Sequence, residues 1–285
     1  FSSHLLAVIN NISVWWHVAG AATVIGILFL VPERHASFSE VFARTINNSG
    51  MFGGSTSGWG WLLFVLPISA ILTQYTITGY DASAHLSEET KSAADAAAKG
   101  IWRSIFYSAI GGWILLLSFL FAVQDADGVS ASGGAVATIF SQALDAKVAA
   151  LVLFISTAGQ LFCTTACQTS ASRMLFAFSR DRAVPGHQLW STINTRRVPA
   201  NAVMVTAGFA ALLTLPALVE VDINGAPVPV AFFAVVSIGV VGLYLCFAVP
   251  IYYRWKAGDT FPAGSWSLRG HHRWMAPVAL AEIIL

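Results

Sequence analysis

The strongest constraint in this chain is a set of six apolar windows, each about long enough to cross a lipid bilayer. They cover residues 11–31, 61–80, 104–123, 149–169, 200–219 and 230–253. A crossing helix needs about 20 mostly apolar residues, because its backbone amides must be satisfied within the segment itself. Only 10% of the 285 residues are charged, whereas a soluble domain carries about a quarter. The sequence therefore predicts an all-α integral membrane protein.

A seventh apolar run begins at Trp274 and reaches the final residue, Leu285. At a rise of about 1.5 Å per residue, this run covers only about half of a crossing. The first ten residues lack the basic start and cleavage site of a signal peptide. We therefore expect the chain to be one piece of a longer multi-pass protein.

The positions of Lys and Arg predict which ends of the helices face the cytoplasm. Twelve of the 15 basic residues precede the third, fifth and seventh apolar runs, whereas Arg34, Arg44 and Lys147 lie in the alternate segments. Basic residues are enriched in cytoplasmic loops, so the larger group is expected inside. The same residues are too scattered to form a basic patch, which argues against a nucleic-acid partner.

Three connecting segments carry local signals. Residues 32–60 are rich in Gly, Ser and Asn, which is typical of an exposed loop. The pair Asn224-Gly225 predicts a tight turn. Ser92, followed three residues later by Asp95, resembles a capping box and predicts a helix over residues 93–103 that leads into the third window.

The end of the second window is the best candidate for a binding site. Polarity increases over QYTITGYD, residues 74–81, without a Lys or Arg to mark a membrane surface. Gly79 weakens a helix by about 1 kcal/mol relative to Ala, and Asp81 and Ser83 are favoured where a helix starts. One interpretation is a broken helix continuing to about residue 90, whose carbonyls at 75–78 accept from an ammonium and whose new N-terminus attracts an anion. The other is a span that simply ends at Tyr80, with Asp81 as an interfacial cap.

Polar residues in the fourth window share one helix face. Thr157, Gln160, Thr164 and Gln168 follow one another at intervals of three or four residues, and Ser156 lies beside them. A polar stripe in a membrane helix faces protein or water. It either lines a pathway or ion site, or it forms hydrogen bonds between helices.

His17 lies inside the first window. A histidine that titrates near neutral pH can relay a proton. Alternatively, a neighbouring carbonyl satisfies the ring, and the adjacent Trp15 and Trp16 mark the interfacial aromatic belt.

The sequence offers little support for a metal centre, a cofactor or an enzyme. Cys163 and Cys167 are four residues apart and would suit a soft metal, but they lack nearby His or carboxylate partners and fit small packing residues better. No phosphate-binding loop, H-E-x-x-H or G-x-S-x-G motif is present. A primary pump or a membrane hydrolase therefore has no motif to support it, which leaves open only a chemistry without a recognisable motif, and we expect no bound cofactor.

Three longer motifs carry a family resemblance. They are TITGYDASAHLSEETKSA at residues 76–93, SRMLFAFSRDRAVP at 172–185 and SFSEVFARTINNSG at 37–50. They closely resemble permeases of the amino acid–polyamine–organocation superfamily, in particular the amino acid/choline transporter branch that includes γ-aminobutyrate permeases. The likeness extends over essentially the whole chain.

The resemblance implies an inverted-repeat transporter fold of twelve membrane helices, of which this chain would supply helices five to ten and the start of eleven. It implies a secondary transporter in the plasma membrane that works by alternating access, usually coupled to a proton or cation. The substrate would be an amino acid or a related small amine such as γ-aminobutyrate or choline. The first helix, which in the family binds the substrate carboxylate, is absent, so we expect this piece alone not to transport.

The resemblance also assigns roles to individual residues. Thr78, Gly79, Tyr80 and Asp81 match the unwound substrate-binding segment of the sixth helix, and Tyr75 matches an aromatic residue that closes over the substrate. Ser156, Thr157 and Gln160 fall in the eighth helix, which holds an ion in sodium-coupled members. His17 falls in the fifth helix, where some proton-coupled members have a Lys in place of that ion.

Two other functions are compatible with a membrane protein of this composition. A nutrient sensor on the same fold would not transport, and a long soluble signalling tail would favour it. A channel would need a continuous polar pore, which one polar stripe and one helix break do not supply.

Overall fold

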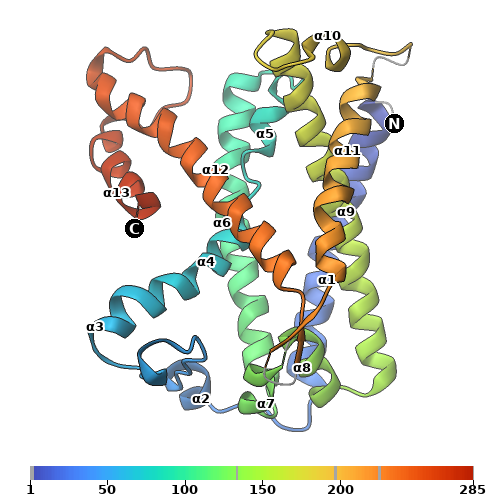
Figure 1. Cartoon of the computed structure of the whole chain (residues 1–285), viewed down its shortest axis with the longest axis vertical. Coiled ribbons are helices and arrows are strands. Elements are labelled where there is room, and N and C mark those ends of the chain that lie inside the picture. Colours follow the sequence, from blue (N-terminus) through green and yellow to red (C-terminus); the bar gives the residue numbers. More distant parts are fainter. Residues whose placement is uncertain (1–2, 133, 196–197, 224–225, 285) are drawn as a thin grey trace.

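The computed structural model describes residues 3–132, 134–195, 198–223 and 226–284, most of which are helical (Figure 1). Six helical segments in these residues are long and apolar enough to cross a membrane. They are Leu5–Leu30, Gly58–His85, Ala93–Ala122, Ala146–Arg180, Ala200–Leu218 and Val230–Thr260. Each corresponds to one predicted apolar window, so the predicted all-α membrane class is confirmed.

Some of the helices that make up these segments are longer than the apolar windows and others are shorter. The long ones are α1 (Ser3–Leu30), α4 (Leu66–Ile77), α6 (Ala93–Ala122), α9 (Ala146–Arg180), α11 (Ala200–Thr214), α12 (Val230–Ala257) and α13 (His272–Ile284). The short ones are α2 (Phe38–Ala43), α3 (Gly58–Gly60), α5 (Ala82–His85), α7 (Ala126–Ala131), α8 (Ala135–Ala143) and α10 (His187–Trp190). A π-helical turn η2 (Trp61–Val65) joins α3 to α4. The remaining turns are 3-10 helices: η1 (Met51–Gly54), η3 (Ser87–Glu89), η4 (Leu215–Leu218), η5 (Gly258–Thr260) and η6 (Arg269–His271).

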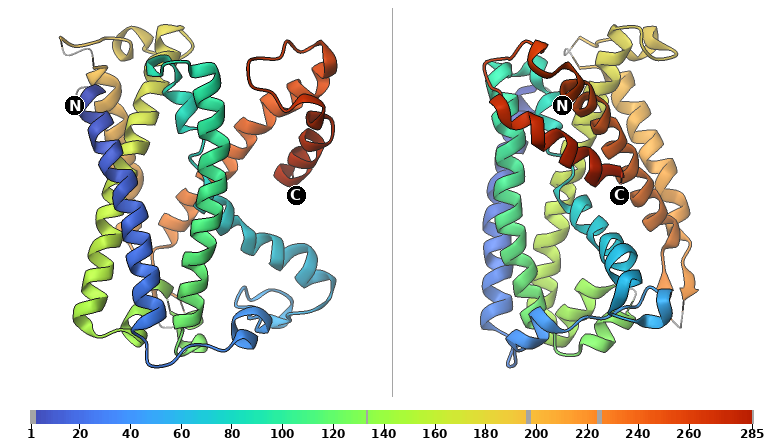
Figure 2. Two further views of the ribbon diagram at one scale, coloured as in Figure 1. Left: turned by 180° about the vertical axis from the view of Figure 1, so that it is seen from behind. Right: turned by 90° about the vertical axis from the view of Figure 1, so that its left-hand side faces the viewer.

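Helices α1, α6 and α9 form the centre of the structure. Both α6 and α9 pack against α1, and α11 packs against the other side of α9 (Figure 2). The helix α12 runs obliquely to these and packs against α13 (Figure 1). The buried apolar cluster lies where α1, α6, α8 and α9 meet, and it contains Val24, Leu28, Ala122, Ile139, Phe140, Leu144 and Val152. Many other apolar side chains of the long helices are exposed, as expected where the surrounding solvent is hydrocarbon.

The connecting segments divide between two ends of the structure. The helices α5 and α10 and the loop before α13 lie at one end, and α2, α7 and α8 lie at the other (Figure 1). The first end carries the segments rich in Lys and Arg. This agrees with the alternation of basic residues along the sequence, and the assignment of this end to the cytoplasm stays a prediction.

Residues 32–60, predicted as an exposed loop, are exposed but partly helical. Ser37 and Glu40 form a capping box at the start of α2, with the Ser37 backbone N donating to Glu40 Oε2 at 2.7 Å. These bonds stabilise the ionised carboxylate and lower the pKa of Glu40. The segment is anchored to the end of α6, since the Ala36 backbone N donates to Phe121 O at 2.8 Å. It is therefore a folded outer layer.

The capping box predicted at Ser92 is wrong, although α6 does begin at Ala93. Ser92 has a left-handed conformation, with φ 53° and ψ 43°, and its side chain makes no cap hydrogen bond. An N-cap side chain needs extended backbone geometry to reach the first turn. The Asp95 carboxylate instead accepts hydrogen bonds from Ser265 Oγ at 2.5 Å and from Lys99 Nζ at 3.2 Å.

Between α11 and α12 the chain forms a short antiparallel hairpin. Strands β1 (Val221–Ile223) and β2 (Ala226–Val228) pair with Val221 opposite Val228 and Ile223 opposite Ala226. The predicted Asn224-Gly225 turn lies outside the described residues. The two strands were not predicted, because two three-residue runs are too short to show strand periodicity.

Candidate substrate site at the interrupted helix

The second membrane segment is interrupted over residues 78–81. The helix α4 ends at Ile77, Thr78 is extended with ψ 149°, and helical geometry resumes in α5 at Ala82. Gly79 has φ 98°, a conformation that residues with a β-carbon rarely adopt. The glycine therefore permits the chain to turn between the two helices.

Several carbonyls at the interruption are hydrogen bonded locally. Tyr75 O accepts from the Thr78 backbone N at 3.1 Å, Gly79 O from Ala82 N at 3.1 Å, and Asp81 O from Ala84 N at 2.8 Å. The sequence predicted that the carbonyls near residues 75–78 would be freed by the break. For the Tyr75 carbonyl this prediction is wrong, because it accepts from Thr78. A carbonyl oxygen has two lone pairs, so these groups retain the capacity to accept from a ligand as well.

The short helix α5 is held between α6 and α9. Ser83 Oγ donates to Ala97 O on α6 at 3.3 Å. Opposite it, a β-carbon added at Gly100 would lie 3.0 Å from Ser83 Cβ, so the glycine favours this close approach. The interruption is thus enclosed by protein on this side, which is where non-helical backbone is tolerated at membrane depth.

Asp81 occupies the predicted N-cap position but does not cap α5 through its side chain. Its Oδ2 accepts from His85 Nε2 at 2.8 Å, and the two side chains are 17% and 25% exposed. Residues four apart on a helix face each other, which places His85 within reach. The sequence reasoning missed His85 as a partner of Asp81, and the four-residue spacing was the available signal.

The two tyrosines assigned to the site lie in different surroundings. The Tyr80 ring is tilted against Phe247 of α12, with centroids 5.4 Å apart. Tyr75 remains 45% exposed. The structure therefore brings Tyr80 to a neighbouring helix and leaves Tyr75 at the surface.

At the end rich in Lys and Arg, an ion pair joins the segment after α5 to α9. Arg180 Nη1 and Nη2 donate to the two carboxylate oxygens of Glu88 at 2.7 and 2.8 Å. The guanidinium favours the ionised carboxylate and lowers the pKa of Glu88. Sequence reasoning missed this pair, because the two residues are 92 positions apart.

A pocket of about 220 Å³ lies beside this ion pair. It is lined by residues of the α5–η3 segment and of α9, including His85, Glu88, Arg173 and Phe176. Arg173 is only 8% exposed. The pocket connects the end of the interrupted helix with the charged end of α9.

The coupling candidate His17 faces α9. Its Nδ1 lies 2.7 Å from Ser13 O in its own helix. This is the contact expected if a neighbouring carbonyl satisfies the ring. A β-carbon at Gly159 would lie 3.4 Å from His17 Nε2. The imidazole therefore contacts α9 within one turn of Ser156 and beside the position of Gln160.

The polar stripe of α9 divides between two roles. Gln168 Nε2 donates to Val203 O at 2.8 Å and to Thr206 Oγ1 at 2.7 Å, so this residue links α9 to α11. Ser156 Oγ donates to Val152 O at 2.9 Å within its own helix. Thr157 and Gln160 are exposed. Hydrogen bonding between helices therefore accounts for Gln168. The end of the stripe that contains Thr157 and Gln160 can still line a pathway or an ion site.

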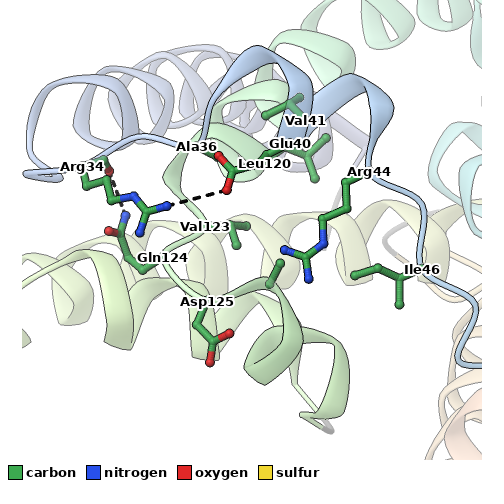
Figure 3. A pocket seen from close by; sticks show the side chains of 11 residues that line it. Arg34, Ala36, Glu40, Val41, Arg44, Ile46, Leu120, Val123, Gln124 and Asp125 are labelled. Carbon is green, nitrogen blue, oxygen red and sulfur yellow. Dashed lines mark hydrogen bonds and ion pairs between the residues drawn. The ribbon is translucent and has the colours of Figure 1, made fainter.

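A second pocket lies at the opposite end of the structure and is not part of this site. It measures about 280 Å³ and lies between the 34–46 segment and the end of α6 (Figure 3). Arg34 points toward Glu40, at 3.6 Å, and Gln124 Nε2 donates to Arg34 O at 2.9 Å. Arg44 pairs with Asp127 at 2.6 Å. These polar contacts join the outer layer to the helices.

The described residues contain no group of three or more His, Cys, Asp or Glu side chains placed to hold a metal ion. Cys163, Cys167 and Cys246 are free thiols.

Comparison with known proteins identifies the family. The family model of amino acid permeases matches residues 1–285. The amino-acid permease BAT1 of Arabidopsis thaliana is 34% identical over 93% of this chain and 51% of its own length. Its homolog in Oryza sativa subsp. japonica is 35% identical over 87% of this chain and 49% of its own length. The thiamine transporter thi9 of Schizosaccharomyces pombe is 32% identical over 74% of this chain and 35% of its own length.

The chain spans about half the length of the plant relatives that it matches. No solved structure gives a significant match. The family model nevertheless covers every residue of the sequence, including the interrupted helix and the polar face of α9. The chain therefore belongs to the amino acid permease family.

Proposed function

We propose that the full-length protein is a secondary active transporter that moves an amino acid or related small amine across the plasma membrane by alternating access. The observation that carries this proposal is the interruption of a membrane helix at residues 78–81, held against α6 and α9. Backbone freed from a membrane helix is suited to bind the polar groups of a substrate. Thr78, Gly79, Tyr80 and Asp81 are the proposed substrate-binding residues, with Tyr75 at the edge.

The cation–substrate coupling is proposed to involve the contact between α1 and α9. His17 lies against Gly159, close to the Ser156, Thr157 and Gln160 face. A proton on His17, or a cation held at this face, would change the charge at the contact of two helices and favour one packing over the other.

The test of transport is uptake of labelled amino acids and amines by vesicles that contain the full-length protein. Saturable uptake of one compound, which collapses when the proton or sodium gradient is dissipated, is the expected result. Correctly inserted protein that takes up none of the compounds would instead favour a nutrient sensor on the same fold.

The role of His17 is tested by replacing it with Gln, which keeps a hydrogen-bonding side chain but cannot titrate near neutral pH. We expect His17→Gln to flatten the pH dependence of uptake, because the glutamine has no proton to exchange at this position. His35→Gln is the matched control, because it removes an exposed imidazole that lies outside the contact between α1 and α9. An unaltered pH profile in His17→Gln would exclude the proton-relay role.

A further inference from the structure

The pocket between the 34–46 segment and the end of α6 plays no part in the proposed transport site. Its volume is about 280 Å³, and its lining combines the charged side chains of Arg34, Glu40 and Arg44 with apolar ones such as Leu120 and Val123. Figure 3 shows the Arg34 and Arg44 guanidinium groups on either side of Val123. Two cationic groups beside an apolar wall suit a ligand that has both an anionic part and an apolar part.

The carboxylates near these arginines leave part of each guanidinium available to a ligand. Arg34 Nη2 lies 3.6 Å from Glu40 Oε1, which is longer than a hydrogen bond. Arg44 donates to Asp127 through Nη2 at 2.6 Å. Asp125 also lines the pocket, but its Oδ1 accepts from the Asp127 backbone N at 3.1 Å as the cap of α7. Because a guanidinium carries five N–H donors, both arginines retain donors for an added anion.

The pocket lies where two membrane segments end. The segment that contains α1 ends at Leu30, and α6 ends at Ala122. The pocket residues Arg34 and Val123 follow these two ends closely in the sequence. The ends of spanning helices lie at the level of the lipid headgroups. A phospholipid is therefore the anion that a membrane supplies at this position, and its phosphate matches the planar fork of an arginine side chain.

The helix α2 separates this charged pocket from an exposed aromatic surface. Glu40 and Val41 of α2 line the pocket. On the same helix, Phe38 and Phe42 pack on Phe121 of α6, with ring centroids 5.3 and 6.4 Å away. Phe38 nevertheless remains 75% exposed and Phe42 59%. A contiguous exposed apolar surface is typical of a membrane or protein contact, and this one, the Phe38–Phe42 surface, lies next to the charged pocket.

We propose that this pocket binds one phospholipid, with its phosphate between Arg34 and Arg44 and its acyl chains along the Phe38–Phe42 surface. The site does not depend on the proposed transport function. The bound lipid contacts both the 34–46 segment and the end of α6, so it stabilises their association in the folded protein.

The test measures binding of phosphatidylglycerol to the purified full-length protein in detergent by native mass spectrometry. The variant that combines Arg34→Gln with Arg44→Gln is expected to raise the Kd at least about tenfold, because it removes charge-assisted hydrogen bonds to the phosphate. Diacylglycerol, which has the acyl chains but no phosphate, should bind the unaltered protein more weakly than phosphatidylglycerol by a similar factor. Glycerol phosphate, which has the phosphate but no acyl chains, should not displace the lipid at equal concentration.

A variant that combines Arg103→Gln with Arg182→Gln is the matched control, because both arginines are exposed and the same net charge is removed away from the pocket. An unchanged Kd in the Arg34 and Arg44 variant, or an equal increase in the control, would overturn the site. Displacement of the lipid by an equal concentration of glycerol phosphate would mean that the ligand is a soluble phosphate ester, and the phospholipid site would be wrong.

Glu40→Gln separates contact with the phosphate from folding of the 34–46 segment. This variant keeps both guanidinium groups and a side chain that can complete the capping box of α2, so it should bind phosphatidylglycerol at least as tightly as the unaltered protein. A loss as large as that of the arginine variant would show that binding follows the packing of the segment rather than the two cationic groups, and it would overturn the assignment.

Discussion

At the scale of single residues, Gly79 is a position where backbone geometry limits substitution within the candidate site. Its φ of 98° lies in the left-handed region, although a β-carbon there would meet nothing within 4 Å. Left-handed backbone costs a residue with a β-carbon roughly 1–2 kcal/mol. We therefore expect Gly79→Ala to lower uptake by the full-length protein about tenfold without affecting membrane insertion, because about 1.4 kcal/mol corresponds to a factor of ten. Gly111→Ala is the matched control, because Gly111 is helical and also has open space; equal uptake by both variants would refute a conformational role for Gly79.

The same residues show how far sequence reasoning reaches at this scale. The combination of Gly79, Asp81 and rising polarity pointed to this segment, because each residue type has a strong local backbone preference, but it left open whether the helix is interrupted or ends there. The partners of the side chains were not predictable in the same way. Asp81 pairs with His85, and Glu88 pairs with Arg180. Only the first pair joins residues four positions apart on one helix. The second depends on the packing of α9, which no local pattern specifies.

At the scale of helices, the contact between α1 and α9 depends on a small residue. A β-carbon at Gly20 would lie 2.8 Å from Ile155 Cγ2, and the branched isoleucine has little freedom to move away. We expect Gly20→Ala to separate the two helices and to destabilise the protein by about 1–3 kcal/mol, as overpacking does. Gly26→Ala on the same helix is the control, because nothing lies within 4 Å of its added carbon. The midpoint of thermal unfolding is measured for both variants in the purified full-length protein. Equal midpoints would show that the contact between Gly20 and Ile155 is not tight.

The number and approximate positions of the membrane helices followed from hydropathy alone, because a helix in hydrocarbon must satisfy its own backbone. The ends of the helices did not follow. The apolar window of α9 covers 149–169, but the helix extends to Arg180, since a helix continues into water when its residues and partners support it. Sequence also missed the folding of residues 32–60, where Ser37, Glu40 and Asn47 form local bonds within a polar segment.

At the scale of the whole molecule, the Glu88–Arg180 pair is an ionic link between the interrupted helix and the C-terminal end of α9. Both side chains are about half exposed, so solvent weakens the pair and its effect should be local. The pKa of Glu88 is lower in the folded protein than its ordinary value of 4.5. The stabilisation is therefore complete above about pH 4.5 and is lost as the pH falls through the lowered pKa.

Hydrogen exchange of the backbone amides in residues 82–92 measures this contribution directly. At neutral pH we expect Glu88→Gln to exchange faster than the unaltered protein over these residues, because the link to α9 is weakened. The difference should vanish below the lowered pKa of Glu88, where the unaltered carboxyl is also protonated; comparing the two proteins at each pH cancels the intrinsic exchange rate. Asp127→Asn, which breaks the exposed Arg44 pair at the other end, should leave these amides unchanged. A difference between Glu88→Gln and the unaltered protein that persists at low pH would mean that the variant alters the packing of α5 rather than its charge, and the ion pair would not be what holds the interrupted helix to α9.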